Sequence, residues 1–143
     1  GVQTCALPIL IVNSLAGLPA FAAYFLASTL ACLVFVFIYT RITPNDEIEL
    51  IRAGNPAAAL SVGLSLIGFS LPLASAIFHT VDLLDCLVWA VVALVAQLLA
   101  YVLARVVMPK LPERIANGEI SAGVWAGCVS IAAGVLNAAC MTW

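Results

Sequence analysis

Two amide side chains, Gln97 and Asn137, are the polar groups best placed for chemistry within the apolar stretches of this sequence. Gln97 falls near the middle of its stretch, and Asn137 falls closer to the outer end of another. Either amide could line a pore or bind a polar solute. The alternative is a hydrogen bond to a neighbouring helix, which contributes about 0.6–2 kcal/mol in a membrane. This interhelical hydrogen bond is the favoured interpretation of both residues.

A second candidate is the cluster of His79, Asp82 and Asp85, which are spaced at i, i+3 and i+6. On one helical turn, His79 and Asp82 could share a divalent metal ion. Two or three such ligands on a solvated loop more often form a charge cluster at a helix end, so no metal site is predicted.

The cysteines of the apolar stretches contain no Cys-x-x-Cys pair. Cys86 and Cys140 fall near the same, oxidising face of the predicted membrane, where they could form a disulfide. Isolated cysteines in membrane helices usually fill space, and that is the favoured interpretation here.

The residue sets that support catalysis are missing from the sequence. It contains no Ser/His/Asp set, no glycine-rich phosphate loop and no pair of redox-cofactor ligands. No Asp, Glu, Lys, Arg or His falls at mid-membrane, where proton-coupled transporters and voltage sensors need ionisable groups. The sequence therefore predicts a protein that is not an enzyme and binds no cofactor, and it argues against a four-helix multidrug antiporter.

The composition indicates an integral membrane protein. Of 143 residues, 65% are hydrophobic and only 8% are charged, and the mean hydropathy is +1.20. Soluble domains carry about 25% charged residues, and disordered chains are poor in large apolar residues. The net charge of −2 offers no basic surface for nucleic acid. The predicted partner is the lipid bilayer.

The elements that position these residues are four predicted transmembrane helices. Charged residues cluster in short segments, and each uncharged stretch is long enough for one crossing, since a helix needs about 20 residues to span the hydrocarbon. No stretch alternates apolar and polar residues as a barrel strand does. The predicted helices cover residues 17–40, 56–78, 86–107 and 120–142.

The first nine residues are set apart from this domain. Residues 1–9 look like the translation of a sequencing-library adapter and are interpreted as an artefactual head. A single four-helix transmembrane domain is predicted over 10–143.

The basic residues predict the orientation. All five Lys and Arg lie in or next to the segments that join the first helix to the second and the third to the fourth. Because Lys and Arg in short loops stay in the cytoplasm, we expect both termini to face the periplasm.

The first of these segments has readable helix signals. Thr43-Pro44-Asn45-Asp46 fits a capping box with proline at the first helical position. Gly54 fits a helix stop, and Asn55-Pro56 fits the start of the next helix.

The chain resembles itself at an offset of 64 residues. Arg41 recurs as Arg105, and Gly54 recurs as Gly118. This similarity predicts two tandem helical hairpins, over about 17–78 and 86–142, which cross the membrane in the same orientation.

Small residues are predicted to hold the helices together, because apolar burial does not drive helix association in lipid. They line the second and fourth helices, which are expected to meet at a tight seam. The predicted packing residues are Ser61, Gly63, Ser65, Gly123, Gly127, Ser130 and Gly134.

Several segments resemble the YjfL-like bacterial inner-membrane proteins, domain-of-unknown-function family 350. They are Ile42-Thr43-Pro44 followed by acids, Asn55-x-Ala57-Ala58-Ala59, Gly68-Phe69-x-Leu71-Pro72-Leu73 and the closing Leu136-Asn137-Ala138-Ala139-Cys140-Met141-Thr142-Trp143. The resemblance runs from about residue 15 to the end. It implies a small multi-pass protein of the bacterial inner membrane, supplies no catalytic residue, and hints at a partner-dependent role near envelope-stress genes.

Two functions remain open at this point. The first is a non-enzymatic membrane component that associates with itself or with other membrane proteins through the small-residue faces of the second and fourth helices. The second is an oligomeric pore for a small solute, with Gln97, Ser61 and Ser65 toward its lumen.

Overall fold

The computed structural model describes residues 15–80 and 82–141, and within these ranges it is all helical. The predicted artefactual head at 1–9 lies outside the described residues. The helices are α2 (Leu18–Ile42), α3 (Glu47–Arg52), α4 (Pro56–His79), α5 (Leu83–Val107), α6 (Leu111–Ala116) and α7 (Ile120–Cys140).

Four of these helices, α2, α4, α5 and α7, are long and apolar enough to cross a membrane. Their lengths are 25, 24, 25 and 21 residues, respectively. Each therefore exceeds the ~20 residues that the hydrocarbon layer requires. The prediction of an all-helical membrane protein with four spans is confirmed, and the observed ends lie within three residues of the predicted ones.

The two short helices, α3 and α6, end in the same way. The amide of Gly54 donates to the carbonyl of Ile51, and the amide of Asn55 donates to that of Leu50. Gly118 and Glu119 repeat both bonds at the end of α6. This Schellman motif needs a left-handed residue, and Gly54 and Gly118 have φ of 85° and 80°. The predicted stop at Gly54 is confirmed.

The predicted start of α3 was wrong. The helix begins at Glu47 and is capped by Asp46, whose carboxylate accepts from the amide of Glu49 at 3.2 Å. Thr43 does not serve as the cap, because its hydroxyl donates to the carbonyl of Tyr39 and so completes the last turn of α2. The predicted cap of α4 is confirmed, because the Asn55 side chain accepts hydrogen bonds from the backbone amides of Ala57 and Ala58 in the first turn of α4.

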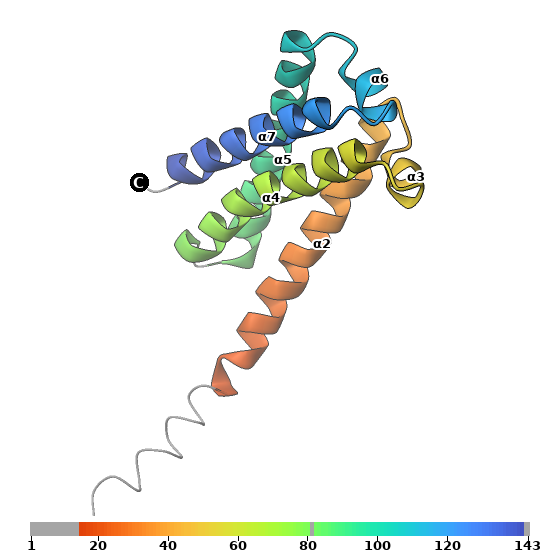
Figure 1. The fold of residues 1–143 in the computed structure, drawn as a ribbon. Coiled ribbons are helices and arrows are strands. Elements are labelled where there is room, and N and C mark those ends of the chain that lie inside the picture. Colours follow the sequence, from red (N-terminus) through yellow and green to blue (C-terminus); the bar gives the residue numbers. More distant parts are fainter. Residues whose placement is uncertain (1–14, 81, 142–143) are drawn as a thin grey trace, which may run out of the picture.

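Helices α4 and α7 lie side by side and run in the same direction (Figure 1). Ala57 meets Gly123 near their first turns, and Gly68 meets Gly134 further along. Helix α5 packs against both. Helix α2 diverges from the others toward its N-terminal end (Figure 1), and only Phe35 and Tyr39 of α2 are buried.

The second half of the described chain repeats the elements of the first. Helix α6 begins 64 residues after α3, and α7 begins 64 residues after α4. The tightest packing, however, joins α4 to α7 across the two predicted hairpins. The division into two hairpins therefore stays a prediction.

Candidate functional site

A buried polar pair joins α5 to α7 in the middle of the bundle. Gln97 is 2% exposed, and its amide nitrogen donates to the backbone carbonyl of Ser130 at 3.1 Å. The Ser130 hydroxyl donates in turn to the Gln97 amide oxygen. Both polar ends of the Gln97 side chain are thus hydrogen-bonded to Ser130 of the same chain.

Gly68 of α4 allows this pair to form. A Cβ at Gly68 would lie 2.5 Å from the Ser130 carbonyl oxygen and 2.9 Å from the Gln97 amide nitrogen. Any side chain there would push α7 and the amide away. The polar pair and the close approach of α4 therefore depend on each other.

Three glycines of α7 face α4. A Cβ at Gly123 would lie 2.3 Å from the carbonyl oxygen of Ala57, and one at Gly127 would lie 2.4 Å from the Leu64 Cβ. One at Gly134 would lie 2.0 Å from the carbonyl oxygen of Gly68. These residues hold the two backbones together in the way that small-residue helix pairs do.

Gly63 is placed differently from these glycines. It is exposed on the outside of α4, and an added Cβ would meet nothing within 4 Å. Asn137 of α7 is half buried, and its amide nitrogen is buried without a hydrogen-bond partner among the described residues.

A second polar group gathers where α2, α4 and α5 approach the short helices. The Tyr39 hydroxyl lies 3.2 Å from the Ser61 hydroxyl, and Ser65 is buried one turn further along α4. The Tyr101 ring meets the Tyr39 ring edge-on at 5.4 Å. Ser61 and Ser65 thus face the interior of the bundle.

Glu47, which no sequence pattern singles out, also lies at this end of the bundle. Although it begins a helix in a connecting segment, it is only 3% exposed. Its Oε2 atom is buried and has no hydrogen-bond partner among the described residues. Burial disfavours the charged form and raises the pKa of Glu47 to about 8. Read from the sequence, Glu47 is one of several acids in a hydrophilic loop, and that setting predicts exposure.

Two asparagines fasten the first connecting segment to the second. The Asn45 side chain donates to the carbonyl of Pro112 at 2.7 Å. Asn55 donates to the carbonyls of Ile115 and Ala116 at 2.9 and 3.0 Å while it caps α4. These bonds join the two connecting segments that contain α3 and α6, which lie at the same end of the molecule (Figure 1).

The opposite end holds the other candidates. His79 Nδ1 lies 2.8 Å from the carbonyl of Ser75 in its own helix, and Asp82 precedes the first turn of α5. The described residues contain no group of three His, Cys, Asp or Glu that could hold a metal ion. Cys86 and Cys140 are free thiols, the first buried and the second exposed.

Comparison with known proteins places the chain in a family. The model of the Domain of Unknown Function DUF350 matches residues 13–141. The chain belongs to the DUF350 family. The resemblance found in the sequence is thereby confirmed.

Named relatives of this DUF350 chain are membrane proteins. It is 43% identical over 124 residues to the UPF0719 inner membrane protein YjfL of Escherichia coli strain K12, an alignment that covers 87% of this chain and 94% of the relative. It is 25% identical over 112 residues to the UPF0719 transmembrane protein YshE of Bacillus subtilis strain 168, covering 77% and 84%. No solved structure matches the chain. With its four apolar helices, this DUF350 protein is a multi-pass protein of the bacterial inner membrane.

Proposed function

We propose that this DUF350 protein is a non-enzymatic membrane component that acts by helix association with a second copy of itself or with other membrane proteins. The observation that carries the proposal is the sparse packing of α2. Phe35 stacks on Phe69 of α4 at 4.5 Å, and Tyr39 contacts Ser61. Toward its N-terminal end, α2 exposes large side chains such as Phe21, Phe25 and Leu26.

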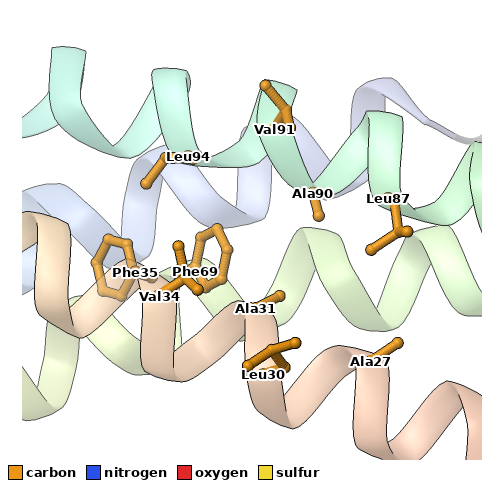
Figure 2. A pocket seen from close by; sticks show the side chains of 10 residues that line it. All are labelled: Ala27, Leu30, Ala31, Val34, Phe35, Phe69, Leu87, Ala90, Val91 and Leu94. Atoms are coloured by element: carbon orange, nitrogen blue, oxygen red, sulfur yellow. The ribbon is translucent and has the colours of Figure 1, made fainter.

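An apolar crevice of about 340 Å³ lies between α2 and α5. Figure 2 shows side chains of both helices directed into it, with Phe35 and Phe69 toward one end. Its lining residues are Ala27, Leu30, Ala31, Val34, Phe35, Phe69, Leu87, Ala90, Val91 and Leu94. Because transmembrane helices pack best where small side chains leave room, the alanines of this crevice suit a helix from another subunit.

The small residues of α7 do not provide such a surface, since Gly123, Gly127 and Gly134 are in contact with α4 inside the protomer. We therefore assign association to the α2–α5 crevice instead of to the faces that the sequence suggested. Leucine at Gly127 would disturb the protomer through Leu64, so that variant does not test association.

A substitution inside the crevice tests the proposal. Ala27→Trp would fill the crevice beside α5, and we expect it to weaken self-association at least about tenfold, which corresponds to about 1.4 kcal/mol. Ala22→Trp is the matched control, because Ala22 is an exposed alanine of the same helix and does not line the crevice. The measurement is subunit number in native-lipid nanodiscs, together with the proteins that co-purify. Equal subunit numbers and equal co-purified proteins for both variants would reject the proposal.

The orientation is part of the proposal. Four of the basic residues occupy the last turns of α2, α3, α5 and α6, and Lys110 precedes α6. All five therefore lie at the α3–α6 end, which we assign to the cytoplasm. Both termini then face the periplasm. A reporter fused to the carboxyl end and found active in the cytoplasm would contradict this assignment.

The alternative of an oligomeric pore has less support. A pore between copies would need Gln97, Ser61 and Ser65 on the outside of the protomer. All three are buried within it, and Gln97 is hydrogen-bonded at both ends. A role in envelope stress, which the family resemblance implies, stays a prediction.

A further inference from the structure

The buried carboxyl of Glu47 lacks the partner that a buried charge requires. Its Oε2 atom has no hydrogen-bond partner among the described residues. The ion pair found in this part of the chain joins Arg114 to Glu119, both of them partly exposed. A carboxylate out of water is stable only when it is paired or hydrogen-bonded, and otherwise it takes up a proton.

Among the residues that the structure describes, no Lys, Arg or His forms an ion pair with Glu47. From α2 comes Tyr39, whose hydroxyl is already bonded to Ser61. From α5 come Tyr101 and Arg105, and the Arg105 guanidinium lies over the Tyr101 ring, 5.8 Å from its centre. The phenol groups of Tyr39 and Tyr101 both lie close enough to interact electrostatically with a charged Glu47.

Neither α4 nor α3 itself provides a buried counter-charge for Glu47. Helix α4, which packs against α3, has no charged residue before His79, at its far end. Within α3, Glu49 and Arg52 are exposed. The preceding Asp46 is also exposed and uses its carboxylate to cap the helix.

We propose that Glu47 is a proton-binding site at the α3–α6 end of the bundle, and that its proton controls the docking of α3 against the transmembrane helices. With the proton bound, the carboxyl is neutral and remains buried. When water removes the proton, the carboxylate is left without a counter-charge, and α3 moves outward until the carboxylate is hydrated. In this step the carboxylic acid of Glu47 gives one proton to a water molecule and becomes a carboxylate.

The burial of the carboxyl also sets the pH of this exchange. Desolvation raises the pKa of Glu47 to about 8 from an ordinary value of 4.5. The exchange therefore falls in the neutral range, well above the pH at which an ordinary carboxylic acid ionises.

Infrared spectroscopy tests the site directly. The protein is produced with ¹³C-carboxyl glutamate, reconstituted in nanodiscs and titrated from pH 4 to pH 10. We expect one labelled carboxyl band that disappears with a midpoint near the pKa of Glu47, about 8. Glu47→Gln should abolish this band, and Glu49→Gln, a change to an exposed acid two residues away, should leave it in place. If all labelled carboxyls titrate below about pH 5, as exposed acids do, the proposal is overturned.

The same titration distinguishes the proton from a metal cation. A midpoint that is unchanged when sodium or potassium chloride replaces choline chloride supports the proton. A midpoint that falls as either metal ion is raised identifies a cation site and overturns the proposal.

Trypsin reports the movement of α3, because Arg52 ends this helix and is exposed. Cleavage after Arg52 is measured for the wild type and for Glu47→Gln at each pH, and the ratio of the two rates removes the pH dependence of trypsin itself. We expect the wild-type rate divided by the Glu47→Gln rate to rise at least about fivefold as the pH passes the midpoint. Glutamine stays neutral and keeps α3 docked, whereas the ionised Glu47 releases it. A ratio that stays constant from pH 6 to pH 10 would refute the control of α3. Should Glu47→Gln fail to fold, the labelled wild-type band alone still decides whether the site exists.

Discussion

Gly134 of α7 lies against the backbone of Gly68 in α4, so close that a Cβ at Gly134 would stand 2.0 Å from the Gly68 carbonyl oxygen. The same glycine of α4 borders the hydrogen-bonded pair of Gln97 and Ser130. One glycine contact thus sets both the separation of the two parallel helices and the geometry of the buried amide.

Gly134→Ala should therefore destabilise the protein. The added methyl group meets backbone atoms, which cannot rotate away, and overpacking of this kind costs about 1–3 kcal/mol. Gly63→Ala is the matched control, because its Cβ points into open space and alanine favours a helix by up to about 1 kcal/mol. Reversible unfolding in bicelles measures both variants. Equal stability of the two would mean that α4 and α7 are not in contact at Gly134.

The glycines also show what the sequence could and could not predict. Four membrane spans follow from the thickness of the hydrocarbon layer and the length of the apolar stretches, and they are found as predicted. The pattern of small residues marks α4 and α7 as packing helices. It does not distinguish Gly127, which contacts Leu64, from Gly63, which faces outward, because small residues occur on more than one face of α4 and only the packed structure selects the face.

Glu47 shows a second reason why the sequence could not predict every site residue. A helix of six residues is too short for its apolar residues to define a buried face by their period. Ile48 and Ile51 are exposed while Glu47 is buried, which reverses the usual pattern. Its position depends on how α3 packs against a transmembrane helix, α4, so no pattern within α3 itself predicts its burial.

The hydrogen bonds between Gln97 and Ser130 should make the two residues energetically coupled. Gln97→Leu and Ser130→Ala each remove one partner of the pair, and hydrogen bonds between membrane helices contribute about 0.6–2 kcal/mol. In a double-mutant cycle, we expect a coupling energy of about 1 kcal/mol. Ser121→Ala is the matched control, because Ser121 is an exposed serine of α7, the helix of Ser130. Its effect on stability should simply add to that of Gln97→Leu, with no coupling energy. Full additivity of Gln97→Leu with Ser130→Ala would show that the two side chains are not bonded in the membrane.

The stability of the protein should fall as the pH rises from about 4.5 to about 8, because of Glu47. In the folded protein the pKa of Glu47 is raised to about 8, whereas 4.5 is its ordinary value. Between these values the folded state holds a proton that the unfolded state has lost, so raising the pH favours unfolding; above pH 8 both states are ionised and the loss is complete. The total change is on the order of a few kcal/mol, since each unit of pKa corresponds to about 1.4 kcal/mol. Unfolding in bicelles across this range measures the slope. Glu47→Gln should flatten it and Glu49→Gln should preserve it, whereas a wild-type slope that is retained in Glu47→Gln would assign the effect to another group.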